Sequence, residues 1–326
     1  MDEKKFYQHL NYLNHWKPAL DAKSKNKVVE SALREGLKDK GRIKILDCGT
    51  GTERGLISLI ENRIITKGDV ETFDISSELI SDMPRLMQEF CSKNGLNYQP
   101  IRYDKKDDFI FNINNKSDTI DIKIHGFQES AYELPKRIND LKEIDLITGQ
   151  AIIEHVNQAI VFPILNTFLK KDGLIYFSMN CDGWFNYSPS NERERDEKIV
   201  GLFNDLALNN QEFKNQDGAI FGGEAFCGRN LPYRFKEYGI ETIAYGPSDW
   251  VVHPFNQTDS ETQFMRYTAE YIKEVCSSAL ASELRNKWDI NEREVYNWYA
   301  EKLNAVIDNQ LGFTCVQKDI LGKKIK

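Results

Sequence analysis

Residues 44–55 read KILDCGTGTERG. The apolar residues before this turn stop at Asp47, Gly49 and Gly51 follow, and apolar residues resume with helical spacing from Leu56 to Ile60. This pattern predicts a strand, a tight turn and a helix. In such a unit the glycines let a ligand approach the backbone, and the free N–H groups at the helix start favour an anionic or carboxylate-bearing group. The segment therefore predicts the first half of a nucleotide-binding sheet.

Two classes of nucleotide site use turns of this kind. A dinucleotide turn reads G-x-G-x-x-G, and this chain has Arg54 where the third glycine would stand. With its acidic residue at the end of the strand, the segment resembles the first motif of class I S-adenosylmethionine-dependent methyltransferases, acidic-x-G-x-G-x-G. The match is at Asp47, Gly49 and Gly51, whereas Glu53 replaces the last glycine. The resemblance implies that S-adenosylmethionine contacts Asp47, Gly49, Thr50 and Gly51.

A second acidic residue supports a nucleoside site. The segment VETFDI, residues 70–75, predicts a strand that ends at Asp74, about 20 residues beyond the glycine turn. A carboxylate there can accept both hydrogen bonds from a ribose diol. A cap for a helix over residues 76–90 is an alternative role compatible with the first. We therefore expect Asp74 and the adjacent Ile75 to lie at the cofactor.

Residues 97–126 are rich in strand formers and contain the turn-like NNKSD. They predict a β-hairpin insertion that leads into the third strand of the sheet, residues 120–124. GFQES follows, and the resemblance implies that a polar group after this strand meets the adenine amino group. Gln128 and Glu129 are the candidates, and exposed loop residues remain the alternative reading.

The segment EIDLITGQAIIEHVNQA predicts the fourth strand and the start of a helix. Because the carboxyl ends of parallel strands border the ligand crevice, Gln150 should lie beside the cofactor. The segment resembles the fourth motif of the same family, with Glu154 and His155 at the matching positions. A histidine titrates near neutral pH, so His155 is the predicted catalytic base, with a surface histidine as the alternative. LKKDGLIYFSMN then predicts the fifth strand, residues 174–179.

These units together predict an α/β fold with a doubly wound, Rossmann-like sheet that is seven-stranded and mostly parallel. We expect a helical N-terminal cap over residues 1–40 and an S-adenosylmethionine-binding core over residues 41–183. Residues 184–326 should complete the sheet and add helical cap insertions. Two amphipathic helices are expected near residues 261–287 and 291–309, and their aromatic stripes favour core packing.

The acceptor side is predicted from segments outside the sheet pattern. Tyr7 and Trp16 would face a ligand from the N-terminal helices, and Trp184, Phe185 and Tyr187 would wall an acceptor pocket. His253 is a second candidate base, although a capping or core role is the stronger reading. The glycine-rich residues 218–228 could hinge a mobile cover.

Composition limits the partners. The chain has 326 residues, is 40% hydrophobic and carries a net charge of −7, so a nucleic acid partner is disfavoured. The six cysteines stand singly, which predicts reduced thiols and no metal site. The sequence shows neither a signal peptide nor a membrane span, so we expect a cytoplasmic protein without a membrane partner. A homodimer stays open.

The sequence therefore predicts an S-adenosylmethionine-dependent methyltransferase with a small-molecule acceptor. Three alternatives remain: a protein methyltransferase, since an acidic surface could recruit a basic chain; an NAD-dependent oxidoreductase, which shares the glycine turn; and a non-catalytic nucleotide-binding module. The acceptor atom leaves no signature in the sequence.

Overall fold

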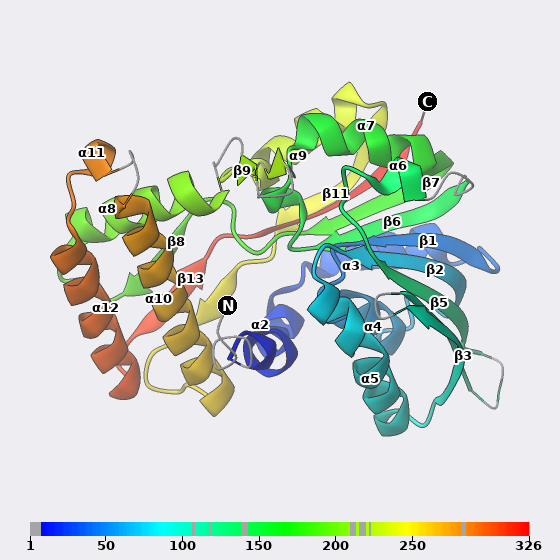
Figure 1. The fold of residues 1–326 in the computed structure, drawn as a ribbon, viewed down its shortest axis with the longest axis horizontal. Coiled ribbons are helices and arrows are strands. Elements are labelled where there is room, and N and C mark those ends of the chain that lie inside the picture. The colour runs from blue at the N-terminus through cyan, green and yellow to red at the C-terminus, as the bar shows by residue number, and fades with distance from the viewer. Residues whose placement is uncertain are drawn as a thin grey trace.

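The computed structural model describes residues 8–105, 108–115, 117, 119–137, 143–208, 213–214, 220–221, 223–281 and 285–325. A nine-stranded sheet lies at its centre (Figure 1). Its strands in chain order are β1 (Ile43–Cys48), β2 (Lys67–Asp74), β3 (Asn97–Lys105), β4 (Asp108–Asn114), β5 (Asp121–Gln128), β6 (Ile144–Gln150), β7 (Leu169–Ser178), β11 (Ile240–Pro247) and β14 (Lys318–Lys324). Across the sheet they run β11-β14-β7-β6-β1-β2-β5-β4-β3.

The predicted strand number is wrong, since the sheet has nine strands and not seven. The additional two are β3 and β4, the hairpin that the sequence predicted as an insertion. β4 pairs with β5 from Asn114 opposite Asp121 to Asp108 opposite Phe127, so the hairpin extends the sheet. Alternate β4 side chains, among them Phe109, Phe111 and Ile113, are buried. This alternation gives the hairpin an apolar face that joins the core.

The strand order reverses at β1. β1 pairs in parallel with β2 on one side and with β6 on the other, so the chain moves outward through β2 and β5 and then crosses back to β6 and β7. In open α/β sheets, ligands bind outside the carboxyl ends of the strands at such a reversal. β14 runs antiparallel between β7 and β11.

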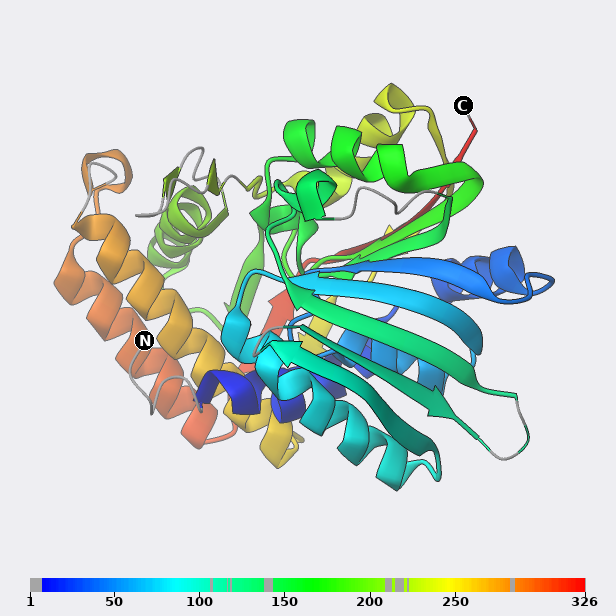
Figure 2. The same ribbon diagram turned by 45° about the vertical axis from the view of Figure 1, so that its right-hand side comes forward.

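Helices cover both faces of the sheet (Figures 1 and 2). One face carries α3 (Lys27–Leu37), α4 (Arg54–Glu61) and α5 (Ser77–Lys93), and the other carries α6 (Leu134–Arg137), α7 (Gln158–Phe168) and α9 (Cys227–Glu237). Successive β1 side chains point to opposite faces. Ile45 packs in the cluster that contains Val29 and Leu33 of α3, and Leu46 packs with Phe162 of α7. This two-sided burial explains the continuous apolar run of the strand.

A second assembly lies beside the sheet, on the left in Figure 1. Three short antiparallel strands, β8 (Phe185–Ser188), β12 (Trp250–Val252) and β13 (Gly312–Cys315), form its sheet. They share an apolar cluster with α8 (Arg193–Phe203), α10 (Asp259–Leu280) and α12 (Glu292–Ile307). α10 and α12 each begin with a capping box, formed by Thr258 with Glu261 in α10 and by Asn291 with Glu294 in α12.

The remaining elements are short. The chain enters through a π-helix, η1 (Tyr12–Trp16), and α2 (Lys17–Ser24), and the others are η2 (Ile153–His155), η3 (Asn204–Leu208), β9 (Phe213–Lys214), β10 (Ile220–Phe221) and α11 (Arg285–Trp288). No helix in the described part of the chain combines the length and apolar character needed to cross a lipid bilayer.

Several predicted elements have different limits. Two segments of the chain, residues 240–252 and 312–324, are each divided between the two sheets. The two stretches that pass from one sheet to the other are hydrogen-bonded to each other. Ser248 N–H donates to the Gln317 carbonyl at 3.1 Å, and Gln317 N–H donates to Asp249 Oδ1 at 2.9 Å. After β6 only the short η2 forms, and the helix expected there begins later, with α7.

Candidate active site

The glycine turn between β1 and α4 has the backbone that its sequence predicts. Gly49, Gly51 and Glu53 have φ of +61°, +54° and +60°, the left-handed region that favours glycine. A Cβ added to Gly49 would lie 2.5 Å from Ile152 Cδ1, whereas one added to Gly51 would meet nothing within 4 Å. Packing therefore requires the glycine at position 49, and Gly51 faces open space.

A cavity of about 350 Å³, here called the main cavity, lies at the carboxyl ends of the strands where their order reverses. One part of its wall comes from the glycine turn and from Asp74, Gln150 and Ala151. A side cavity of about 250 Å³ adjoins it and is lined by Ile75, Glu129 and Ser130 among others. Gly49, Asp74, Ala151 and His155 border both cavities.

Asp74 joins the two cavities. Its Oδ2 accepts the Gly51 N–H at 2.9 Å and its Oδ1 accepts the Ser76 N–H at 2.9 Å. Burial raises the pKa of Asp74, and these backbone donors oppose that rise. A carboxylate oxygen can accept more than one hydrogen bond, so both oxygens retain acceptor capacity toward the cavities.

The other part of the main-cavity wall is aromatic. Tyr12 of η1 stacks on Tyr267 of α10 with ring centroids 4.4 Å apart, and His9 Nδ1 lies 2.7 Å from the Tyr267 hydroxyl. Burial raises the pKa of Tyr267 and lowers that of His9, so both side chains are neutral near pH 7. Further lining comes from Tyr271, Phe185, Trp250 and Phe313.

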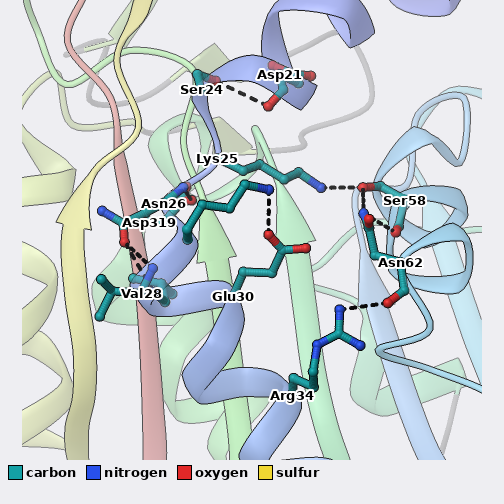
Figure 3. Close-up of polar contacts among 12 residues, drawn as sticks. Asp21, Ser24, Lys25, Asn26, Val28, Glu30, Arg34, Ser58, Asn62 and Asp319 are labelled. Carbon is teal, nitrogen blue, oxygen red and sulfur yellow. Dashed lines mark hydrogen bonds and ion pairs between the residues drawn. The ribbon is translucent and has the colours of Figure 1, made fainter.

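The N-terminal helices cover this aromatic part and are tied down behind it. Lys17 and Asp21 of α2 line the main cavity as an ion pair of 2.5 Å. At the end of α2, Lys25 Nζ donates to Ser58 Oγ of α4 at 2.6 Å, and Asn26 N–H donates to Asp319 Oδ2 of β14 at 2.8 Å (Figure 3). The cover is therefore anchored to both the glycine-turn helix and the sheet.

Two further charged side chains line the main cavity. Arg54, the first residue of α4, has a buried Nε without a hydrogen-bond partner among the described residues, and burial lowers its pKa. Glu154 is fully buried, and its Oε1 accepts the Asn180 N–H at 2.9 Å. Arg54 is thus a cation available to a bound carboxylate.

Most of the residues predicted for the cofactor meet at these cavities. Gly49, Thr50, Gly51, Asp74 and Gln150 line the main cavity. Ile75 and Glu129 line the side cavity. His155, the predicted base, is exposed at the rim that the two cavities share.

Asp47 and Gln128 lie elsewhere. Asp47 is buried behind the glycine turn and lines neither cavity, and its Oδ2 accepts the Thr72 hydroxyl at 3.3 Å. β5 extends to Gln128, so the loop that was expected to hold this residue begins after it. The Gln128 side chain is exposed and donates to the Ile75 carbonyl at 2.9 Å.

Of the predicted acceptor residues that the structure describes, Phe185 lines the main cavity and the others do not. Trp16 packs against the apolar cluster of the second assembly, and Tyr187 is buried there with its hydroxyl 3.3 Å from the Met265 carbonyl. Trp184 lines a separate cavity of about 640 Å³, and His253 is exposed. Tyr7 lies outside the described residues, as does Gly218 at the start of the predicted hinge.

The residues that the sequence reading missed are His9, Tyr12, Arg54, Tyr267 and Tyr271. Tyr267 and Tyr271 are four residues apart on α10, and this spacing was read as a core stripe. Tyr12 lies four residues before Trp16 in the same helical segment, η1. The sequence therefore pointed to the correct segment, but Tyr12 and not Trp16 lines the cavity. Within the described ranges, no group of three or more His, Cys, Asp or Glu side chains could hold a metal ion.

No protein-family model and no curated protein sequence matches this chain. Solved structures give weak similarities. A putative sarcosine dimethylglycine methyltransferase from Galdieria sulphuraria is 14% identical, with 92% of this chain and 83% of that chain covered and a TM-score of 0.42. An S-adenosylmethionine-dependent methyltransferase from Thiobacillus denitrificans, in complex with S-adenosylhomocysteine, is 11% identical, with 90% and 91% covered and a TM-score of 0.39.

Geranyl diphosphate C-methyltransferase from Streptomyces coelicolor A3(2) is 12% identical, with 90% of this chain and 77% of that chain covered and a TM-score of 0.38. At this level of similarity, the ligands and acceptors of these proteins carry no information about this chain.

Proposed function

We propose that this chain is an S-adenosylmethionine-dependent methyltransferase that acts on a small-molecule acceptor. The observation that carries the proposal is one continuous main cavity at the strand reversal, with the glycine turn and Asp74 on one side and aromatic side chains on the other. Such a cavity can hold a nucleoside-bearing donor and a second, largely apolar molecule in contact with each other.

The donor half suits the parts of S-adenosylmethionine. Asp74 would accept the ribose hydroxyls, and the side cavity next to it, with Ile75 and Glu129, would take the adenine. Arg54, whose buried Nε is unsatisfied within the described residues, would pair with the carboxylate of the methionine tail. Gly51, where an added Cβ meets open space, would leave room for that tail. When bound, the donor supplies a methyl group on a positively charged sulfur.

The chain's own residues then position the acceptor and exclude water. Tyr12, Tyr267 and Tyr271 present neutral phenol groups because burial raises the pKa of each. A neutral, aromatic-lined pocket favours a small apolar or aromatic acceptor. His155 remains the proposed base. Its exposed position lets it pass a proton from the shared rim to solvent.

The dinucleotide alternative is less well supported. Dinucleotide-binding sheets have the strand order 3-2-1-4-5-6, all parallel, with a third glycine for close helix packing. Here β14 runs antiparallel between β7 and β11, and Arg54 stands at the third-glycine position and lines the cavity.

A cytoplasmic location is also part of the proposal. All six cysteines are free thiols.

Calorimetric titration of the purified protein with S-adenosylmethionine, S-adenosylhomocysteine and NAD tests the donor class. The proposal requires saturable binding of both adenosyl ligands and no binding of NAD. Binding of NAD alone would restore the oxidoreductase, and binding of none of the three would remove the nucleotide function altogether.

A further inference from the structure

Two carboxyl groups without a role in the proposed reaction lie behind the glycine turn. Asp47 is 4% exposed and Glu53 is fully buried. The fully buried Thr72 lies between them, with its Oγ 3.3 Å from Asp47 Oδ2 and 3.1 Å from Glu53 Oε1. A hydroxyl has only one proton to donate. Two full hydrogen bonds form here only if one carboxyl group is protonated and donates its own proton to Thr72 Oγ; otherwise the single Thr72 proton is divided between two carboxylates.

The surroundings of this pair also favour a bound proton. Asp74 on β2 is a third carboxyl group nearby, and Cys48 is the adjacent thiol on β1. β6 contributes only uncharged residues at its end, Thr148 to Gln150, and the neighbouring cation of α4, Arg54, lines the main cavity. Burial together with Asp74 raises the pKa of Asp47 to about 7, and burial together with Asp47 raises that of Glu53 well above its usual value.

We propose that Asp47 and Glu53 share one proton across Thr72 in the ligand-free protein, and that a ligand with a cationic amino group expels this proton when it fills the main cavity. This inference rests on the proposed function, since the methionine tail of the donor and the homocysteine tail of its product both carry such an amino group. Thr50 and Gly51, which stand between Asp47 and Glu53 in the sequence, line the cavity.

The physical reason is the charge that the ligand brings. A buried carboxyl pair without a cation holds a proton because two adjacent negative charges repel each other in a medium of low dielectric constant. A positive charge placed in the adjoining cavity stabilises the doubly ionised pair. Binding and ionisation are then linked, so affinity rises with pH while the pair in the free protein still holds its proton.

Glu53 is the member of the pair that departs from the motif. It occupies the position of the last glycine in the motif that the turn resembles, and it keeps a glycine-like backbone with φ of +60°. A non-glycine residue in this region is under backbone strain, because its Cβ lies close to the following carbonyl oxygen. The strained position therefore carries a carboxyl group where the motif needs no side chain, which is consistent with a role for that group in ligand binding.

Proton release upon binding is measured directly by calorimetry. S-adenosylhomocysteine is titrated into the wild-type protein near pH 7, the value to which the pKa of Asp47 is raised, in two buffers with different heats of ionisation. We expect a buffer-dependent heat that corresponds to the release of up to one proton. The dissociation constant should fall with rising pH by at most about tenfold per pH unit.

Glu53→Gln tests which residue is responsible, because the amide can donate to Thr72 Oγ without a titrating proton. We expect binding to persist with a buffer-independent heat, whereas Glu61→Gln, an exposed change on the same helix, should behave as wild type. Glu53→Gly gives the same test if the glutamine variant does not fold. Equal proton release in wild type and in a Glu53 variant, or no release in wild type, would overturn the inference.

A measurement without ligand separates this inference from the proposed function. Infrared spectra of the ligand-free protein at pH 7 should show a protonated carboxyl band in wild type that is missing in Glu53→Gln. Absence of the band in wild type would overturn the shared proton. If the band is present but S-adenosylhomocysteine does not bind, the shared proton stands and the donor assignment fails.

Discussion

The Asp74 carboxylate accepts the backbone N–H of Gly51 at 2.9 Å, and this bond joins the end of β2 to the glycine turn after β1. One residue thereby shapes the turn and faces both cavities. The relationship makes Asp74 the residue whose loss should be most visible in ligand binding.

Asp74→Ala should weaken binding of S-adenosylhomocysteine at least tenfold. The change removes up to two charge-assisted hydrogen bonds to the ribose, each worth roughly 1.5–3 kcal/mol. Calorimetry measures the affinity, and thermal unfolding shows whether the turn also loosens. Asp172→Ala, an exposed carboxylate paired with Lys323 away from the cavities, is the matched control. An unchanged dissociation constant for Asp74→Ala would remove Asp74 from the ligand site.

Gly51→Ala should abolish adenosyl binding while the protein stays folded. The new methyl group meets no protein atom within 4 Å, so it projects into the space that the ligand would occupy. The left-handed backbone at φ +54° adds a strain cost of roughly 1–2 kcal/mol. Gly95→Ala is the control for that strain, since Gly95 has φ of +64° and equally open surroundings away from the cavities. Normal affinity in Gly51→Ala would contradict the ligand position.

Substitutions of Gly49 should affect stability first. A Cβ there would lie 2.5 Å from Ile152 Cδ1, so we expect even Gly49→Ala to lower the unfolding temperature. Thermal unfolding of this variant beside Gly51→Ala separates the two roles, and equal unfolding temperatures would show that Ile152 can move aside.

The N-terminal cover should become protected when ligand binds. In hydrogen exchange, amides of residues 8–24 should slow upon addition of S-adenosylhomocysteine, because α2 and the residues before it line the main cavity. Amides of α12, none of whose residues lines that cavity, should not change. If residues 8–24 exchange at the same rate with and without ligand, the cover is only packing and a macromolecular acceptor returns as a candidate.

Deletion of residues 1–40 is not the right test of that cover. Within this segment, α3 buries Val29, Leu33 and Leu37 in the sheet core, and each such side chain contributes roughly 1.5–3 kcal/mol. We therefore expect the truncated chain to unfold, whereas Tyr12→Ala should fold and lose acceptor binding. Circular dichroism compares the two variants.

His125 should make the stability of the sheet depend on pH. Its Nδ1 lies 2.6 Å from Glu71 and its Nε2 lies 2.9 Å from Asp108. Burial lowers the pKa of His125, but its two carboxylate partners outweigh this effect and the net pKa is raised. The stabilisation is therefore full below the unfolded-state pKa of about 6.5 and is lost as pH rises through the higher folded-state pKa.

His125→Gln should remove this part of the pH dependence. Chemical unfolding of both proteins from pH 5 to 9 measures it, with His15→Gln, an exposed histidine, as the control. Parallel stability curves for wild type and His125→Gln would show that the histidine carries no net charge in this cluster.

The part of the cavity wall at the strand ends could be predicted from the sequence, because each of its residues lies next to a strand that the sequence itself indicates. The glycine turn, Asp74 and Gln150 each follow directly from the end of a strand, and parallel strand ends meet at one edge. The aromatic half could not be read in this way. Its residues come from positions as distant as His9, Phe185, Tyr267 and Phe313, and only the packing of the second assembly against the sheet brings them together.

The errors have the same origin. Phe185 and Tyr187 lie on the same face of β8 and pack in the same apolar cluster, yet only Phe185 lines the main cavity. β8 belongs to this cluster through its pairing with β13, a partner strand more than a hundred residues away in the sequence.

The proposed activity is tested most directly by methyl transfer itself. Purified protein is incubated with methyl-labelled S-adenosylmethionine together with a small-molecule extract and, separately, with a protein extract. We expect label in the low-mass fraction in the first incubation and none in protein in the second, with transfer lost in Asp74→Ala. Label that enters only protein, or no transfer from a donor that binds, would contradict it.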